Sequence, residues 1–568
     1  YRVRPEPETF LKVLLSMESP HDISKYNISR LVASAQNTKH RYMLVISGDQ
    51  AWCQERLCEA LHGGFDDMSE SASQSLLNSR RTLVVSRDPL LVSAQDNTDI
   101  QTTPPDKIKH LLGGECDLLI WDAFSGLCPD ALGAASGLLK GGGIFFLIMP
   151  HLKVFSTSPD PDYQRMCNHQ DELTTFNTYF LQRVANLLQS EPGIQLIRQN
   201  DARSEEFKLV DEPLPTVNHT QLPTADQLSA IGAIEKVATG HRNRPLVIEA
   251  DRGRGKSSAL GIAAAQLVND YQHKVIITAP NFRACGQVFK HFELNLKGSL
   301  QADSDLGQLS LDFYPPDTLV SSFPTCHIIL VDEAAAIPNP ILKKILAHYP
   351  RVVFASTIHG YEGTGQGFAI RFKKELTRQT PQWKSLAMST PIRWSAEDPL
   401  EKWVFKLLFL NARLPTILTI NKPLPSDIKW FSQRELFENP AILKQIVSLL
   451  VTAHYQTSPD DIRLILDHPK VHLVCMQSSP TKSEPPLVQN IIGVCLLIEE
   501  GKLDDMQVIE GVLNGERRLK GHLVPQSLAT FSGNEQFLHH KTFRVMRIAV
   551  HPSLTNQGIG TALLDEAR

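Results

Sequence analysis

The first 205 residues alternate short apolar runs with longer amphipathic stretches. The apolar runs lie at residues 42–47, 82–86, 117–121 and 143–149. Short buried strands that alternate with helices are typical of a parallel sheet, so we expect an α/β unit over residues 1–205. Its first strand leads into Gly48-Asp49-Gln50 without a Gly-Lys-Ser triplet, so no phosphate loop is predicted here. We interpret this unit as a scaffold or an RNA platform.

Two further units follow. A polar segment at residues 200–218 predicts a linker. A second α/β unit is expected over residues 219–420, with a buried strand at 245–249 and an Ala/Leu-rich helix at 257–269. A third is expected over residues 425–568, with a helix at 433–455, a strand pair at 473–476 and 491–499 joined by a polar loop at 478–486, and a strand at 543–550. The predicted fold class is multidomain α/β.

Composition narrows the class of protein. The 568 residues are 42% hydrophobic and 21% charged, with no run of 18 apolar residues, so no membrane span is predicted. A net charge of −4 argues against a uniformly basic nucleic-acid binder. The nine cysteines form no paired CxxC motif, which favours free thiols and a cytoplasmic location.

The second unit contains a candidate nucleotide triphosphate site. A strand is followed by Ala250-Asp-Arg-Gly-Arg-Gly-Lys-Ser-Ser258 and then by a helix, which is the context of a phosphate loop. Its glycines allow the backbone N–H groups to converge on phosphates, Lys256 would neutralise them, and Ser257 would bind Mg²⁺. An apolar strand then delivers Asp332 to the metal and Glu333 to the attacking water. The residues expected to bind ATP in this loop are Ala250, Asp251, Arg252, Gly253, Arg254, Gly255, Lys256, Ser257 and Ser258.

Four further segments of this unit resemble superfamily-1 helicases. Gln227 precedes the core as an adenine-reading glutamine would, and Arg393 in Thr390-Pro-Ile-Arg-Trp394 resembles a γ-phosphate sensor. Segments 274–280 and 354–357 resemble two other helicase motifs. About 200 residues hold only one RecA-like core, whereas a translocating helicase needs two. Remodelling driven by ATP is therefore favoured over processive unwinding.

The third unit contains a candidate acyl-CoA site. The strand at residues 543–550 is closed by His551-Pro552, and Asn556-Gln-Gly-Ile-Gly560 then leads into an apolar helix. This resembles the Gcn5-related N-acetyltransferase motif, in which turn N–H groups and a helix N-terminus hold the CoA pyrophosphate. The main-chain N–H of Val550 would polarise the thioester carbonyl. The expected acetyl-CoA residues are Ile548, Ala549, Val550, Thr555, Asn556, Gln557, Gly558, Ile559, Gly560 and Thr561. Since this motif lies close to Arg568, we expect the acetyltransferase domain to be incomplete at its C-terminus.

With both sites in this order, the chain resembles the bacterial tRNA(Met) cytidine acetyltransferases. Shared stretches include residues 331–338, 390–394 and 520–526. The resemblance implies acetyl transfer from acetyl-CoA to the N4 amine of the wobble cytidine of elongator tRNA(Met), coupled to hydrolysis of ATP or GTP with Mg²⁺. It also implies an RNA-binding tail beyond residue 568. We expect a monomer in the cytoplasm. Two alternatives stay open: a protein lysine acetyltransferase with a regulatory nucleotide-binding domain, and an RNA remodelling protein with a degenerate acetyltransferase domain.

Contacts to RNA and the acid or base of acetyl transfer are less well defined by the sequence. Basic and aromatic groups suited to RNA occur at residues 371–374, at 517–520 and at 539–543. Glu499, Glu500 and His551 lie near the acyl-CoA strand, but each is predicted to be a solvated strand end. No catalytic acid or base is therefore assigned.

Overall fold

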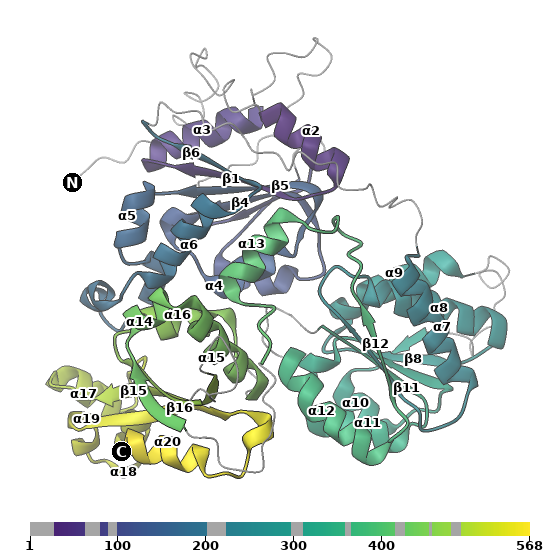
Figure 1. Cartoon of the computed structure of the whole chain (residues 1–568). Helices are drawn as coiled ribbons and strands as arrows, with labels where there is room; N and C mark the ends of the chain where they lie inside the picture. The colour runs from purple at the N-terminus through teal and green to yellow at the C-terminus, as the bar shows by residue number, and fades with distance from the viewer. Residues whose placement is uncertain are drawn as a thin grey trace, which may run out of the picture.

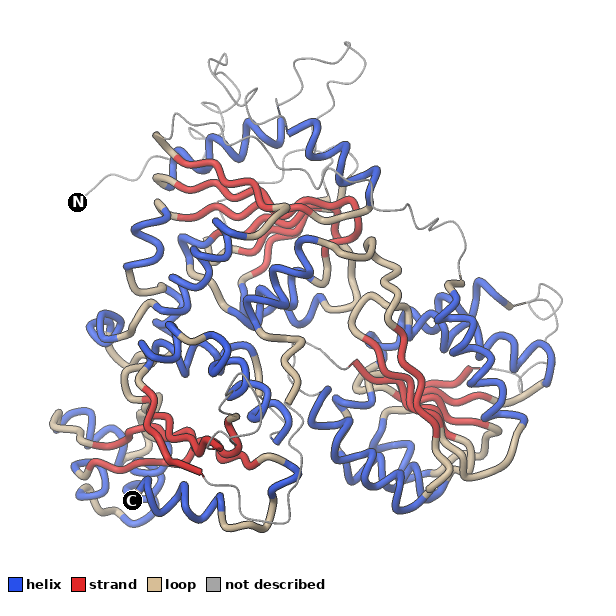
Figure 2. The backbone as a smooth tube through the Cα atoms, viewed as in Figure 1, coloured by secondary structure: helices blue, strands red, loops and turns tan. Residues whose placement is uncertain are grey.

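The computed structural model describes residues 28–62, 80–88, 99–200, 223–296, 311–357, 365–414, 426–453, 457–478 and 490–568, and the side chains of residues 365–371 lie outside this description. Three sheets, each flanked by helices, make up the molecule (Figure 1, Figure 2). Nearly all of the predicted linker at 200–218 and of the loop at 478–486 falls outside the described residues. None of the described helices has the length and apolar character needed to cross a bilayer. All nine cysteines are free.

The N-terminal sheet is parallel throughout, as predicted, with strand order β3-β2-β4-β5-β1-β6. Two of its strands, β3 and β6, were not predicted, because β3 (Ile-Gln-Thr-Thr) has only one apolar residue and polar residues interrupt the apolar ones of β6 (Ile-Gln-Leu-Ile-Arg). The strands are β1 (Tyr42–Ser47), β2 (Thr82–Val85), β3 (Ile100–Thr103), β4 (Cys116–Asp122), β5 (Leu139–Met149) and β6 (Ile194–Arg198).

Two helical layers cover this sheet, because alternate residues of each strand point to opposite faces. Leu44 packs towards α2 (Ile28–Thr38) and α3 (Gln50–His62). Val45 packs towards α4 (Pro129–Ser136) and α6 (Tyr179–Ser190). The remaining helical segments of this unit are α5 (Leu152–Thr157) and four 3-10 turns, η2 (Pro105–Leu111), η3 (Ala123–Ser125), η4 (Pro161–Arg165) and η5 (Gln170–Thr175).

The second unit is also a parallel sheet, with strand order β12-β7-β11-β10-β8-β9. The strand before the phosphate loop, β7, is separated from the acidic strand β10 by β11, which pairs with both. The strands are β7 (Leu246–Ala250), β8 (Val275–Thr278), β9 (Leu311–Phe313), β10 (Ile328–Val331), β11 (Val352–Thr357) and β12 (Lys384–Met388). One face is covered by α7 (Ala225–Thr239), α8 (Lys256–Tyr271) and α9 (Gly286–Asn295), the other by α10 (Pro316–Ser322), α11 (Asn339–His348) and α12 (Gly365–Gln379).

The third unit is an antiparallel sheet of β13 (Ser426–Phe431), β14 (Val471–Ser478), β15 (Ile491–Gly501) and β16 (Lys541–Val550), in that order. The predicted pairing of residues 473–476 with 491–499 is confirmed. The prediction of a single continuous helix at 433–455 is wrong. It is split into α14 (Gln433–Glu438) and α15 (Pro440–Ala453), because Pro440 disfavours helical backbone at Asn439.

Helices cover both faces of this third sheet. Helix α16 (Pro459–Asp467) and α15 pack on one face, and α20 (Ile559–Ala567) packs on the other. Between β15 and β16 the chain forms a small helical cluster of α17 (Met506–Leu513), α18 (Leu523–Ser532) and α19 (Gln536–His539).

The N-terminal unit contacts both of the others. Helix α13 (Pro399–Leu408) follows the second sheet in sequence but packs against α4 and α6 of the N-terminal unit (Figure 1). At its start, the buried Arg41 and Asp398 form an ion pair at 2.8 Å. On the acetyltransferase side, Arg463 of α16 pairs with Asp160 at 3.3 Å, inside a continuous buried core. The N-terminal unit thereby joins the other two.

Candidate nucleotide and acyl-CoA sites

The phosphate loop has the backbone geometry that its glycines predict. Strand β7 ends at Ala250, and α8 begins at Lys256 after Gly255, whose φ is 81°. Gly253 has φ of 77°. A Cβ at Gly253 would lie 2.9 Å from the ring of Trp394, and one at Gly255 would lie 2.5 Å from Nε2 of Gln227. Backbone conformation and space therefore both require glycine at these two positions.

Lys256 and Glu333 are connected through Thr357 at the end of β11. The buried Lys256 ammonium donates to Oγ1 of Thr357 at 3.0 Å. The same hydroxyl donates to a carboxylate oxygen of Glu333 at 2.8 Å. Strand β11 lies between the strands that lead to these two residues. A side chain at the end of β11 can therefore form hydrogen bonds with both.

Ser257 and Asp332 together could hold a divalent ion. The Ser257 hydroxyl donates to Oδ2 of Asp332 at 2.8 Å, and Asp332 is fully buried. Burial and the neighbouring Glu333 carboxylate raise the pKa of Asp332. Hydroxyl and carboxylate oxygens are ligands that suit Mg²⁺. The described residues contain no cluster of three or more His, Cys, Asp or Glu side chains that could hold a metal ion.

Glu333 has a strained backbone, with φ of 46°. A left-handed conformation is uncommon for a residue other than glycine, and it is often found at functional sites. It turns the chain directly after Asp332, so that consecutive carboxylates occupy different positions: Asp332 beside Ser257 and Glu333 beside Thr357.

A cavity of about 520 Å³ lies over the phosphate loop. Not every predicted ATP residue borders it. Gln227 and Asp332 contact the loop without bordering the cavity. The Gln227 side chain donates to the carbonyl of Gly255, and the Asp332 carboxylate accepts from the hydroxyl of Ser257. The predicted residues that line the cavity are Arg252, Gly253, Gly255, Lys256, Ser257, Ser258, Glu333 and Arg393, whereas Gln227, Ala250, Asp251, Arg254 and Asp332 do not line it.

Arg254 points away from this cavity. Its guanidinium pairs with Glu401 of α13 at 2.8 Å, and its Nε donates to the carbonyl of Ser389 at 3.1 Å. The side chain is buried and lines a second cavity on the other side of the loop. The structure therefore gives Arg254 a partner on α13, at a distance from the predicted nucleotide position.

The N-terminal unit also lines the nucleotide cavity, which the sequence analysis missed. Arg393, the predicted phosphate sensor, is 3.3 Å from Glu115 and donates to the carbonyl of Gly137 at 3.2 Å. Its own carbonyl accepts from the N–H of Gly141 at 2.7 Å. No motif in residues 1–205 points to this role, because it depends on tertiary packing. The additional lining residues are Lys39, Gly113, Glu115, Lys140 and Gly141 from the N-terminal unit, with Ala284, Gln287, Lys290, His291, Ile392 and Trp394.

The predicted acyl-CoA residues lie together in one strand-turn-helix segment. Ile548, Ala549 and Val550 end β16, a 3-10 turn (Pro552–Leu554) follows, and Gly558 is the N-cap of α20 with φ of 78°. A Cβ at Gly558 would meet no atom within 4 Å, so the turn is open to a ligand. The helix N-terminus leaves backbone N–H groups unpaired, as anion binding requires. The other predicted residues, Thr555, Asn556, Gln557, Ile559, Gly560 and Thr561, all belong to this turn or to the first turn of α20.

The register of β16 favours the predicted role of Val550. Among the described residues, β16 forms one edge of its sheet. The N–H of His551 donates inward to the carbonyl of Ile492 at 2.9 Å. Because successive residues of a strand direct their N–H groups to opposite sides, the N–H of Val550 faces the outer edge. A thioester carbonyl beside that edge could accept its hydrogen bond.

Two of the three strand ends predicted to be solvated are buried. Glu500 is 1% exposed, and its carboxylate accepts from Arg544 at 2.6 Å and from the N–H of Val524 at 2.9 Å. His551 is 5% exposed. The prediction was wrong for these residues because the helical cluster after β15 covers Glu500, and the turn after β16 folds over His551. Glu499 is partly exposed and pairs with Lys541 at 2.7 Å.

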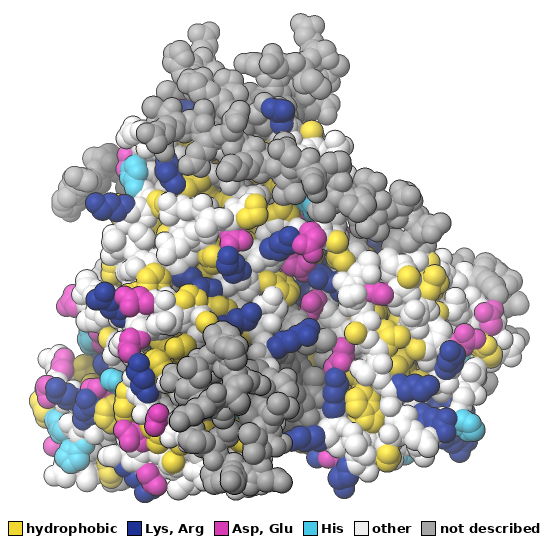
Figure 3. Space-filling model, viewed as in Figure 1, with side chains coloured by type: hydrophobic (Ala, Val, Ile, Leu, Met, Phe, Trp, Pro, Cys, Tyr) yellow, Lys and Arg dark blue, Asp and Glu magenta, His cyan; other side chains and the backbone are white. Residues whose placement is uncertain are grey.

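The predicted RNA-binding groups are only partly available on the surface. Phe372 is buried and Lys373 pairs with Glu249 at 2.7 Å, whereas Lys374 is exposed and the side chain of Arg371 lies outside the described residues. Arg518 and Lys520 are exposed. In the viewed face, Lys and Arg side chains are spread over the three units and mixed with Asp and Glu (Figure 3). No single large basic surface appears on that face.

Three family models match this chain. Residues 17–199 match the N-terminal domain of tRNA(Met) cytidine acetyltransferase TmcA. Residues 247–411 match the helicase domain of RNA cytidine acetyltransferase NAT10/TcmA. Residues 445–567 match the model described as GNAT acetyltransferase 2. The order of the three matches is the order of the three sheets.

Relatives with the same description align along most of the chain. The tRNA(Met) cytidine acetyltransferase TmcA of Nitrosococcus halophilus is 36% identical over 94% of this chain and 69% of its own length. That of Vibrio cholerae is 37% identical over 80% of this chain and 59% of its own length. That of Haloarcula marismortui is 30% identical over 95% of this chain and 69% of its own length. The chain therefore spans between about three fifths and seven tenths of these relatives. The chain belongs to the tRNA(Met) cytidine acetyltransferase TmcA family.

Proposed function

We propose that this protein transfers the acetyl group of acetyl-CoA to the N4 amine of the wobble cytidine of elongator tRNA(Met), with hydrolysis of ATP or GTP. The observation that carries the proposal is the presence of a phosphate-loop site and an acyl-CoA turn in a chain of the TmcA family. Such an enzyme would act in the cytoplasm, where tRNA is modified, and we expect it to be a monomer.

Acetyl transfer requires precise positioning more than a strong base. The exocyclic amine of cytosine is delocalised and a weak nucleophile, so its nitrogen must be held against the thioester carbon while the carbonyl oxygen is stabilised. The outward N–H of Val550 supplies a hydrogen bond to that oxygen. The turn around Gly558 and the N-terminus of α20 hold the pyrophosphate. As the new C–N bond forms, the C–S bond breaks and CoA leaves as its thiolate, which takes up the proton that the amine releases.

Nucleotide hydrolysis would use the residues that meet around Thr357. Lys256 neutralises the β and γ phosphates, and Glu333 orients the attacking water. Ser257 and Asp332 would hold Mg²⁺, which supplies charge neutralisation at the phosphates. Unstacking an anticodon base costs a few kcal/mol, and one hydrolysis event could readily supply that amount.

An acetylation assay tests this proposal. The protein would be incubated with radiolabelled acetyl-CoA and either bulk tRNA or a mixture of proteins, with and without ATP. We expect label in tRNA only, and strong dependence on ATP. Lys256→Ala should abolish hydrolysis and depress tRNA acetylation while acetyl-CoA binding survives.

Other outcomes would identify the two alternatives. Label in lysine side chains, with none in tRNA, would support a protein acetyltransferase. ATP hydrolysis stimulated by RNA, without transfer to either substrate, would support a remodelling protein whose acetyltransferase domain is degenerate. Full acetylation by Lys256→Ala would show that the two sites are not coupled.

A further inference from the structure

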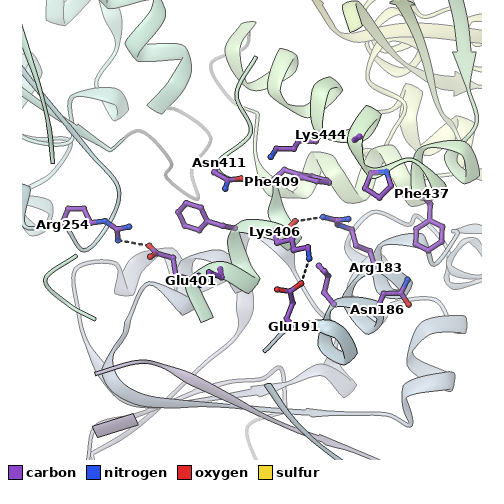
Figure 4. A pocket seen from close by; sticks show the side chains of 15 residues that line it. Arg183, Asn186, Glu191, Arg254, Glu401, Lys406, Phe409, Asn411, Phe437 and Lys444 are labelled. Atoms are coloured by element: carbon purple, nitrogen blue, oxygen red, sulfur yellow. Dashed lines mark hydrogen bonds and ion pairs between the residues drawn. The ribbon is translucent and has the colours of Figure 1, made fainter. Parts of the chain in front are cut away.

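A second cavity, of about 820 Å³, lies where the three units meet (Figure 4). Its walls come from α6 of the N-terminal unit, from α13, and from α14 and α15 of the acetyltransferase unit. The phosphate loop contributes Arg254, whereas its neighbours Arg252 and Gly253 line the nucleotide cavity. The two cavities therefore lie on opposite sides of one loop. This junction cavity has no role in the function proposed so far.

The junction cavity carries an excess of positive charge. Its two acids are each paired with a cation, Glu401 with Arg254 at 2.8 Å and Glu191 with Lys406. The cations that line it are Arg183, Arg254, Lys402, Lys406 and Lys444, against the acids Glu191 and Glu401. Lys402 also pairs with Glu397, so two of these cations, Arg183 and Lys444, have no acidic partner among the described residues, and an anionic ligand is favoured.

Arg183 is the buried cation of this cavity for which a bound anion would be most favourable. It is buried, and among the described residues it forms no ion pair with a carboxylate. Its guanidinium donates to the carbonyls of Leu407, at 3.2 Å, and Lys406, and it stacks 4.2 Å from the ring centre of Phe409. Burial lowers the pKa of Arg183 to about 10. A buried cation without a counter-ion costs free energy, which a bound phosphate would offset.

Aromatic rings and carboxamides complete the lining. Phe405 and Phe437 are both partly exposed, and Phe437 stacks on Tyr179 with ring centres 5.2 Å apart. Asn186 and Asn411 add donors and acceptors. Rings that accept a stacked base, beside cations that accept phosphates, are the chemistry by which single-stranded RNA is held. Lys444 is exposed on α15, and no ion pair of it appears in the described part of the chain.

We propose that the junction cavity binds an unpaired segment of the tRNA substrate, with phosphates at Arg183 and Lys444 and a base against Phe405 or Phe437. This inference rests on the proposed function and deepens it. RNA in this position would touch α15, which packs on β15 and β16, and also α13, whose Glu401 holds Arg254. One ligand would thereby contact the element next to the acyl-CoA strand and the partner of the phosphate loop.

The test compares Lys444→Ala with a matched control, Lys344→Ala. Lys344 is also an exposed helical lysine, but it lies on α11, outside the cavity. Binding of fluorescently labelled tRNA(Met) would be measured by anisotropy across a salt series. We expect Lys444→Ala to weaken binding about tenfold and to reduce the slope of log K against log salt by about 0.7, the value for one lost single-strand phosphate contact. Lys344→Ala should bind within twofold of wild type.

A second variant and a competitor distinguish the remaining explanations. Phe437→Ala should also weaken tRNA binding, without changing the salt slope, while nucleotide and acetyl-CoA affinities stay unchanged for all variants. Cytidine monophosphate and inorganic phosphate should not displace tRNA at millimolar concentration. Displacement by either would overturn the inference in favour of a small-anion site. Wild-type tRNA affinity in both Lys444→Ala and Phe437→Ala would also overturn it, while active acetylation would leave the proposed function intact. Absence of tRNA binding by the wild-type protein would instead contradict the proposed function.

Discussion

Thr357 contacts both Lys256 and Glu333, so a single hydroxyl links the cation predicted to bind phosphate to the acid predicted to orient water. We expect Thr357→Val to keep the size of the side chain and remove both hydrogen bonds. Nucleotide affinity should change less than threefold, whereas the rate of hydrolysis should fall roughly 100-fold, since a misplacement of a catalytic group by about 1 Å has an effect of this order. Steady-state phosphate release and nucleotide titration would separate the two effects. An equal loss in both would indicate that Thr357 only maintains the fold of the loop.

A pH effect on stability is expected from Asp467, which lies between the N-terminal and acetyltransferase units. The buried carboxylate accepts hydrogen bonds from the hydroxyl of Tyr163 and the N–H of Phe180, yet burial raises the pKa of Asp467 to about 7. The ordinary value is 3.8, so between about pH 4 and pH 7 the folded chain holds a proton that the unfolded chain has lost. Stability from this group is therefore greatest at low pH and decreases as pH rises towards 7.

Asp467→Asn isolates this contribution, because asparagine has a similar shape and does not titrate. The melting temperature would be measured at pH 5.5 and pH 8 for both proteins. We expect the wild type to lose more stability than the variant over this interval, by the free energy of releasing close to one proton. Parallel curves for the two proteins would show that Asp467 ionises normally in the folded state.

At the scale of single elements, the turn between β16 and α20 is the clearest point at which to separate the two activities. Gly558→Glu would add bulk and negative charge where the pyrophosphate is expected. Gly515→Glu is a matched control, because Gly515 also has a positive φ, 74°, and also has no atom within 4 Å of a Cβ. We expect only Gly558→Glu to lose acetyl-CoA binding, by at least tenfold in calorimetry, with hydrolysis of ATP unchanged in both.

The sequence predicted the elements best where each carries its own signal. The phosphate loop follows from glycines beside Lys256, and the acyl-CoA turn from Gly558 after a β-strand, since these backbone shapes are dictated locally. The prediction of a single helix at 433–455 was wrong because it followed the apolar pattern and overlooked Pro440, which is a local signal for a break. Strand β3 was missed because only one of its four residues is apolar.

Contacts between the units could not be predicted, because no local pattern specifies them. Arg254 has the same sequence context as its neighbours in the loop, yet it pairs with Glu401, which is 147 positions away. Arg393 was found by its motif, but its partner Glu115 lies in a unit that has no nucleotide motif at all. Within the third unit, the burial of Glu500 also depends on residues distant in sequence, Arg544 and Val524.

For the whole molecule, the main consequence is that the nucleotide cavity is shared between two units. One RecA-like core provides the phosphate loop, and the N-terminal unit provides the opposite wall with Lys39, which follows α2, and Lys140 of β5. A nucleotide bound in this cavity would contact the N-terminal unit, although that unit has no phosphate loop of its own. Lys140 pairs with Asp117 at 2.6 Å, whereas Lys39 is exposed and forms no ion pair among the described residues.

Lys39→Gln tests whether the wall contributed by the N-terminal unit contacts the nucleotide. Loss of one exposed cation near a phosphate should weaken affinity for a fluorescent ATP analogue about three- to tenfold at low salt, and less at high salt because exposed charges are screened. Lys107→Gln is the control, since Lys107 is an exposed lysine of the same unit that does not line the cavity. If the two variants bind the analogue equally well, the N-terminal unit closes the cavity only sterically, and its influence on hydrolysis would have to pass through Glu115, Gly137 and Gly141, which hold Arg393 in place.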